Sequence, residues 1–249
     1  MKNQLIIPTN VIINADDFGL NIKRNQAITK CFQKELINST SIMPNMLSFK
    51  EAIVSAKDYN FQENIGLHAC ITEGKSLTDL SKTPFVDKEG FFIKKQVYKP
   101  TLFLSKSVRH LLKIEVVAQL EALKKSGIKP THINTHHDIH ELPWLLPIFL
   151  NISKKHKIKL RVSQIWIDGK NSLKPLYRKL VNGVYKYHKL NFTDYFETLE
   201  IYKKKRLQKT DPYKITEIMV HPDLDRSGRI TDSLESGDLE KVILILFDQ

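Results

Sequence analysis

Histidines and aspartates gather at a few points of this sequence where they could bind a metal ion or move protons. Asp16 and Asp17 are adjacent, His68 lies in an apolar stretch, and His221 precedes a proline. The stretch THHDIH, Thr135 to His140, holds three histidines in six residues. Carboxylate and imidazole ligands suit zinc, or a harder ion such as magnesium, manganese or cobalt. Histidine also serves as a general acid or base near neutral pH.

Each of these residues also has a plain structural interpretation. An isolated Asp-Asp pair is more often an Asx turn or a helix cap, and a single histidine in an apolar stretch is more often a satisfied core residue. His137 is expected to lie exposed on the surface, and His221 could be a turn residue. The functional interpretation therefore depends on whether the fold brings these positions together.

Strand-like and helix-like stretches alternate along the whole chain, which predicts a parallel sheet. We expect strands at residues 11–14, 39–45, 64–72, 131–134, 159–163 and 215–222. We expect helices after Gly19, over 48–57, over 105–125, after residue 143 and over 173–187. Ser48 and Glu51 form a capping box at the start of the second helix. Gly127 follows the end of the third, and Pro143 suits the first turn of the fourth. This pattern predicts an α/β fold with parallel strands and outer helices. A complete or incomplete (β/α) barrel fits best, and an open doubly wound sheet is second.

The candidate residues lie within or just after four of these expected strands: Asp16 and Asp17, then His68, His136 and His221. The carboxyl ends of parallel strands meet on one face, and barrel active sites lie there. We therefore expect the four positions to converge. Three protein ligands with one open position would make such a site catalytic.

Composition limits the other possibilities. The chain has 249 residues, a hydrophobic fraction of 41% and a net charge of +12, which fit a single globular domain over residues 1–249. The lysines are spread along the chain with one dense run at Tyr202 to Lys209, so no nucleic-acid partner is expected. Cys31 and Cys70 form no metal or disulfide pattern, and the N-terminus resembles neither a signal peptide nor a membrane span. A cytoplasmic location is the expectation.

The segment from Glu73 to Thr101 is long and weakly periodic. Loops of this length are uncommon and often functional. It could be a lid over a site or a variable insertion.

Four stretches, IINADDFGLN, GLHACITEG, THINTHHDIHELP and EIMVHP, together resemble the YdjC-like carbohydrate deacetylases. They extend from Ile12 to Pro222 in the order found in that family. The resemblance implies a distorted (β/α) barrel, a divalent metal ion and removal of an N-acetyl group from an amino sugar or a short oligosaccharide. A homodimer is possible.

By position, the resemblance implies a role for each matched residue. Asp17, His68 and His136 would be the metal ligands, Asp16 the general base and His221 the acid, with His140 and Arg161 near the substrate. The chain departs from the family pattern at Asn134 to Asp138, where Asp-Ser-His is usual. A metal-dependent phosphoesterase on a similar barrel is an alternative, as is a basic anion-binding protein with a vestigial site.

Overall fold

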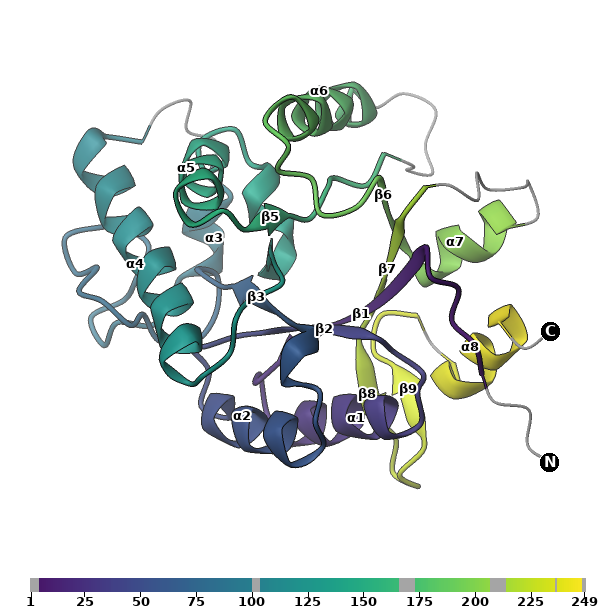
Figure 1. The fold of residues 1–249 in the computed structure, drawn as a ribbon. Coiled ribbons are helices and arrows are strands. Elements are labelled where there is room, and N and C mark those ends of the chain that lie inside the picture. Colours follow the sequence, from purple (N-terminus) through teal and green to yellow (C-terminus); the bar gives the residue numbers. More distant parts are fainter. Residues whose placement is uncertain (1–4, 100–103, 166–172, 207–213, 236, 248–249) are drawn as a thin grey trace.

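A computed structural model describes residues 5–99, 104–165, 173–206, 214–235 and 237–247. Its centre is a curled sheet of seven parallel strands in the order β5-β4-β3-β2-β1-β7-β6. The strands are β1 (Val11–Phe18), β2 (Ser39–Ile42), β3 (Ile65–Ala69), β4 (His132–Thr135), β5 (Lys159–Leu160), β6 (Tyr195–Thr198) and β7 (Thr216–Val220). The predicted incomplete barrel is confirmed (Figure 1).

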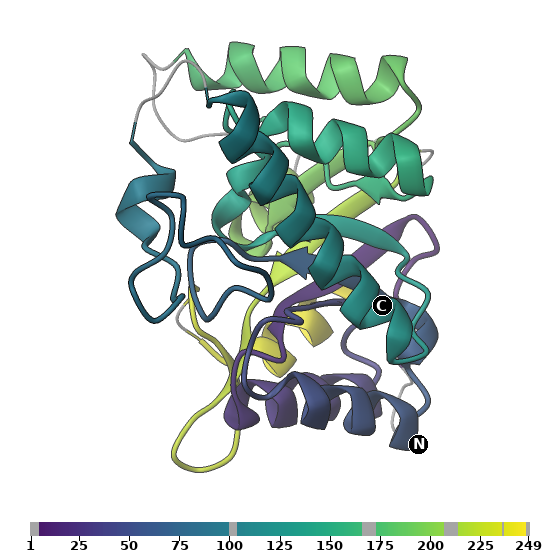
Figure 2. The same ribbon diagram turned by 90° about the vertical axis from the view of Figure 1, so that its left-hand side faces the viewer.

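Helices surround this sheet (Figures 1 and 2). They are α1 (Ile22–Gln33), α2 (Phe49–Asp58), α3 (Lys94–Val97), α4 (Lys106–Lys125), α5 (Leu146–His156), α6 (Lys174–Tyr187), α7 (Leu199–Arg206) and α8 (Leu239–Phe247), with 3-10 turns η1 (Gln62–Asn64) and η2 (His136–Glu141). The antiparallel pair β8 (Pro222–Leu224) and β9 (Ile230–Asp232) packs on α1. Every described helix is too short or too polar to cross a bilayer.

The two edges of the half-barrel approach each other at one end. β5 is only two residues long, and an isolated parallel bridge joins Leu160 to Asn191, a few residues before β6. The Leu160 amide donates to the Leu190 carbonyl, and the Phe192 amide donates to the Leu160 carbonyl. This contact brings the segment around Arg161 toward the interior that the other strands enclose.

Several local expectations need correction. Ser48 does precede α2, but its side chain makes no capping bond, and Glu51 instead accepts a hydrogen bond from Asn25. α5 has Pro147, not Pro143, in its first turn. The expected strand at 159–163 is reduced to β5. The Arg161 amide still donates to the Ile133 carbonyl of β4, but the Ser163 amide bonds the Asn182 side chain of α6.

Cys31 and Cys70 are buried free thiols, as expected for reduced core cysteines. Their burial raises both thiol pKa values, that of Cys70 to about 11.

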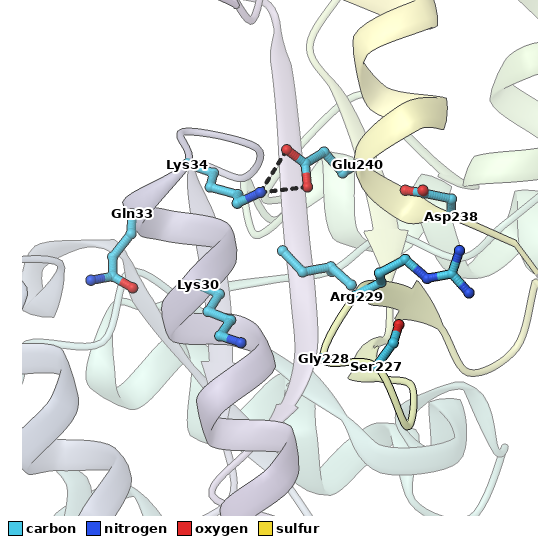
Figure 3. Close-up of a pocket in the computed structure, with 9 residues that line it drawn as sticks. Lys30, Gln33, Lys34, Ser227, Gly228, Arg229, Asp238 and Glu240 are labelled. Atoms are coloured by element: carbon cyan, nitrogen blue, oxygen red, sulfur yellow. Dashed lines mark hydrogen bonds and ion pairs between the residues drawn. The ribbon is translucent and has the colours of Figure 1, made fainter.

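A surface pocket of about 470 Å³ lies between α1 and the β9 region (Figure 3). Lys34 Nζ bonds both carboxylate oxygens of Glu240 there, at 2.7 and 2.6 Å, which ties α8 to α1. Cationic and anionic side chains alternate around it, so it presents no single sign of charge. It shares no residue with the site described next.

Candidate active site

A β-bulge places both aspartates of β1 at the carboxyl end of the sheet. Ala15 pairs with Thr40 and Phe18 with Ile42, so Asp16 and Asp17 together oppose one residue of β2. Asp17 takes a left-handed backbone conformation with φ of 69°. A bulge re-aims side chains and is common next to active sites. Both carboxylates are buried, and each contacts different partners.

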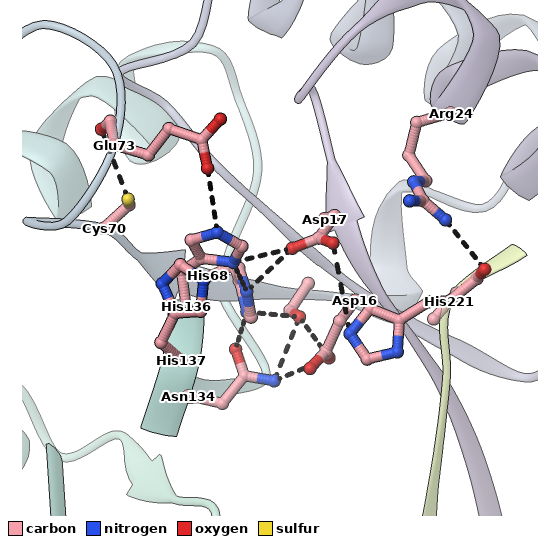
Figure 4. Close-up of polar contacts among 12 residues, drawn as sticks. Asp16, Asp17, Arg24, His68, Cys70, Glu73, Asn134, His136, His137 and His221 are labelled. Carbon is pink, nitrogen blue, oxygen red and sulfur yellow. Dashed lines mark hydrogen bonds and ion pairs between the residues drawn. The ribbon is translucent and has the colours of Figure 1, made fainter. Parts of the chain in front are cut away.

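Asp17, His68 and His136 form a compact cluster (Figure 4). Asp17 Oδ1 lies 3.2 Å from His68 Nε2 and 3.0 Å from His136 Nδ1. The two nitrogens are 3.4 Å apart. The three side chains come from the ends of β1, β3 and β4, as the parallel topology predicts. Asp17 Oδ1 is buried and accepts no well-aligned hydrogen bond, so one oxygen and two nitrogens point at a common centre.

The hydrogen bonds around His68 determine which ring nitrogen faces the cluster. His68 Nδ1 lies 2.8 Å from Asn134 Oδ1. The amide group of Asn134 donates to Asp16 and Ser41, so its oxygen is the atom available to accept from Nδ1–H. Nε2 is then left with its lone pair directed at Asp17 and His136, which is the state that a metal ligand needs.

His136 is oriented in a similar way. Its Nε2 donates to Glu73 Oε2 at 3.1 Å, so Nδ1 is directed at Asp17. Burial lowers the pKa of His136, but the nearby carboxylates of Asp17 and Glu73 outweigh burial and raise it to about 9. Burial would raise the pKa of Asp17, yet His136 and His68 hold it well below its usual value. This donor set, one carboxylate and two imidazoles, fits a divalent ion such as zinc.

Asp16 belongs to a fully buried charge network. Arg161 Nη1 and Nη2 donate to Asp16 Oδ2 and Oδ1 at 2.6 and 2.7 Å, and Arg161 also bonds Glu217 Oε1 at 2.9 and 2.6 Å. The side chains of Asn14, Ser41 and Asn134 all donate to Oδ1 of Asp16. Burial would raise the pKa of Asp16, but Arg161 outweighs it and keeps this carboxylate ionised.

The backbone around His221 is held from two sides. Arg24 Nη1 donates to the His221 and Pro222 carbonyls, both at 2.7 Å, and Asp232 Oδ2 accepts from the His221 amide at 2.7 Å. The His221 ring is partly exposed, and its Nε2 lies 4.0 Å from Asp17 Oδ2. The expected convergence of the four strand ends is therefore present.

The other two expected positions, His140 and Arg161, are buried. Arg161 is 1% exposed and engaged by two carboxylates, and His140 is fully buried with Nδ1 2.7 Å from Thr135 Oγ1. Neither side chain is exposed, and their expected place near the substrate stays a prediction. His137 is exposed, as expected.

The segment after Glu73 packs beside the cluster. Its Lys94 Nζ lies 2.8 Å from His137 Nε2, and Tyr98 Oη donates to the His137 carbonyl. His137 and Asp138 both have positive φ, 62° and 51°, which breaks the 3-10 turn η2 where the chain leaves the family pattern. The segment is therefore attached to the site through Glu73 and Lys94, and its residues 100 and 101 lie outside the described ranges.

Three contributing residues were not singled out from the sequence: Ser41, Glu73 and Glu217. Asn134 was noted only as a departure from the family pattern. Ser41 and Asn134 lie near strand ends, so the same rule that selected the histidines could have selected them. Glu217 is a charged residue inside an apolar strand, which is a signal of a buried partner.

The fold and the cluster together define a class: a parallel half-barrel protein with an Asp-His-His candidate metal centre at the carboxyl ends of its strands. The sequence profile described as YdjC-like protein matches residues 10–242. The chain belongs to the YdjC-like protein family.

Curated relatives agree with this placement, and a solved structure shares the fold. A carbohydrate deacetylase of Vibrio cholerae is 30% identical over 217 residues, which cover 85% of this chain and 77% of that protein. One of Clostridium beijerinckii is 33% identical over 151 residues, 61% of this chain but only 59% of its own length. A structure from Enterococcus faecalis V583, described as a candidate cellobiose-phosphate cleavage protein, has a TM-score of 0.69 at 23% identity and covers 96% of this chain and 90% of its own.

Proposed function

We propose that this protein is a metal-dependent carbohydrate deacetylase that removes N-acetyl groups from amino sugars or short N-acetylglucosamine oligosaccharides. The observation that carries the proposal is the Asp17–His68–His136 cluster, with three ligand atoms within 4.8 Å of one another in a chain of this family. The relatives named carbohydrate deacetylase supply the reaction class.

Asp17, His68 and His136 would hold the ion. A divalent metal ion, when bound, lowers the pKa of water toward about 7 and polarises a carbonyl. An amide needs both effects, because it is a poor electrophile and neutral water is a poor nucleophile. The nitrogen and oxygen donors suit zinc or magnesium, with manganese or cobalt as alternatives. They do not select one of these ions.

The protein's own residues would move the protons. Asp16 would accept the proton of the attacking water, as a carboxylate that Arg161 keeps ionised and fixed in place. His221 would donate a proton to the departing amine. Its ring lies near Asp17, and Arg24 and Asp232 bond the backbone of His221. General acid and base catalysis of this kind contributes about a hundred- to ten-thousandfold. In this arrangement Arg161 positions Asp16 and does not contact the sugar.

The alternatives receive less support from the geometry. A phosphoesterase would need a cation facing the substrate, and the buried Arg161 is committed to Asp16 and Glu217. A vestigial site would not need the oriented hydrogen bonds that Asn134 and Glu73 make to the two histidines.

Acetate release from N-acetylglucosamine oligosaccharides tests the proposal, with chelator and with each metal added back. Asp16→Asn should keep bound metal and lose turnover, whereas His68→Ala should lose both. A fully active Asp16→Asn protein would overturn the base assignment. Unchanged turnover after complete metal removal would overturn the metal-dependent reaction.

A further inference from the structure

Several apolar side chains of helix α6 face outward, although such residues of a helix in a globular protein usually face the core. Its outward residues form a ridge of five side chains: Leu173 at its start (82% exposed), Leu176 (60%), Leu180 (64%), Val184 (36%) and Tyr187 (83%). At 3.6 residues per turn these five positions fall within about 80° of arc. Amphipathic helices normally turn such a stripe toward the core.

The inner face of α6 is fixed by polar contacts, so the ridge cannot simply rotate inward. Tyr177 Oη donates to the Glu141 carbonyl at 2.6 Å, and Arg178 Nε bonds Glu141 Oε2 at 2.7 Å. Asn182 exchanges two hydrogen bonds with the backbone of Ser163, at 2.7 and 2.8 Å. Only Val181 and Tyr185 of the helix are buried.

The charged side chains of α6 itself are all positive. Residues 174–193 contain no acidic side chain. Lys179 and Lys186 are exposed and lie along one flank of the ridge, and Lys189 follows the helix. α6 forms one outer edge of the molecule (Figures 1 and 2), and the ridge residues and these lysines are exposed in the described structure.

We propose that α6 docks this protein on an anionic lipid surface, with the ridge in the headgroup layer and the flanking lysines at the lipid phosphates. A helix with an apolar face, a lysine-rich flank and a moderate length of about 20 Å has the features of helices that lie in a membrane interface. Tyr187 at the end of the ridge suits the same boundary, since its ring is apolar and its hydroxyl is polar. Such docking is peripheral and requires no spanning helix.

A second copy of the chain fits the ridge less well. A two-fold interface presents the same patch from both subunits. The lysines of one α6 would then meet the lysines of the other, with no acidic residue on either helix to compensate. A convex ridge also offers a protein partner no groove, whereas lipid headgroups adapt to it.

Vesicle co-sedimentation of the full chain tests the proposal. The probes are vesicles of phosphatidylglycerol with phosphatidylcholine, and vesicles of phosphatidylcholine alone. The unchanged protein should bind the anionic vesicles and release from them as salt is raised. Leu176→Ser with Leu180→Ser should weaken binding by at least about tenfold, because two side chains leave the apolar layer. Lys179→Gln with Lys186→Gln should weaken it by about fivefold for each lysine.

Matched controls separate the ridge from the general charge of +12. Val54→Ser with Ile245→Ser removes two exposed apolar residues from α2 and α8, at the far end of the molecule from α6. Lys50→Gln with Lys57→Gln removes two charges around α2. Both controls should bind nearly as well as the unchanged protein.

Three results would overturn the proposal. One is no binding to the anionic vesicles at low salt, and another is equal weakening by the ridge variants and their controls. The third is a dimer that the Leu176→Ser, Leu180→Ser change dissociates, without vesicle binding, which would assign the ridge to a second copy. None of the ridge residues touches the Asp17 cluster, so every variant should still deacetylate free oligosaccharides. If no variant and no unchanged protein did so, the proposed function would be wrong, and the docking proposal would be unaffected.

Discussion

Asp16 and Asp17 are neighbours in the chain but lie in opposite electrostatic settings. Asp16, Arg161 and Glu217 form a closed half of the site, in which Arg161 makes a bidentate bond to Asp16 and all three side chains are buried. Asp17, His68, His136 and Glu73 form an open half, in which three ligand atoms face one another across a centre and Glu73 is half exposed.

The bulge in β1 therefore supplies one carboxylate to each half: Asp16 to the closed half and Asp17 to the open half. In the closed half one guanidinium bonds two carboxylates inside the protein, so this half contributes a fixed framework. The open half gathers lone pairs that few protein donors satisfy, which is a cost that a bound cation would offset. The following changes test that division.

Removing the arginine of the closed half should have the largest effect. Arg161→Met leaves Asp16 and Glu217 buried without their partner, and breaking a buried pair in this way costs about 3–5 kcal/mol. Urea unfolding in the presence of chelator measures this change in the free energy of unfolding. Arg229→Met, at an exposed ion pair with Asp225, should cost less than about 1 kcal/mol. Equal losses in the two variants would remove the distinction between the halves.

Acid should lower the free energy of unfolding through two buried histidines, His132 and His140, whose charged forms burial and the charge of Arg161 disfavour. Burial lowers the pKa of His132 to about 3 and that of His140 to about 4. The unfolded chain takes up these protons at about pH 6.5, so the free energy of unfolding falls as pH drops below 6.5, by about 2 kcal/mol for each histidine at about pH 5. This stability is fully present above pH 6.5 and is lost toward the folded pKa.

Urea midpoints at about pH 7 and about pH 5 measure this loss. His140→Leu should remove its share of the pH dependence, whereas the exposed His110→Gln should leave the dependence unchanged. An identical pH dependence in His140→Leu and the unchanged protein would contradict the burial argument.

Asn134 joins the two halves, because it accepts from His68 and donates to Asp16. Asn134→Leu should lower metal affinity by about ten- to a hundredfold, the usual effect of losing a partner that orients a ligand. Isothermal titration with zinc measures the affinity. Asn45→Leu, which removes a buried amide that bonds the Glu73 carbonyl, is a comparison variant with a smaller expected effect. Unaltered zinc affinity in Asn134→Leu would show that His68 needs no such partner.

The smallest effect should come from the rim of the open half. Glu73→Gln keeps an acceptor for His136 Nε2 but removes a half-exposed charge, so zinc affinity should fall by less than about tenfold. The same titration checks it. A loss as large as that of a direct ligand such as Asp17 would instead make Glu73 a ligand itself.

Much of this arrangement could be predicted from the sequence. Alternating strands and helices predicted the parallel half-barrel, and strand ends predicted that Asp17, His68, His136 and His221 meet. The roles given to these residues stay predictions until metal binding and turnover are measured.

The remaining features depended on information that local patterns do not hold. The bulge between Ala15 and Phe18 is set by pairing with β2, and no local signal marks it. Arg161 was placed beside the substrate, but its burial follows from the short β5 and from Glu217, more than fifty residues away in sequence. Ser48 and Glu51 matched a capping pattern, yet the Glu51 carboxylate accepts a hydrogen bond from Asn25 of α1 instead.

The bulge in β1 also has a consequence for how such a site can change over time. A strand with regular pleating turns only every second side chain inward, so one strand end normally supplies one inward group. The additional residue at Asp16–Asp17 lets a single strand supply two, without a new loop or a further strand. Deleting either aspartate would therefore do more than remove a carboxylate, since it would shift the register of everything that follows it toward Gly19.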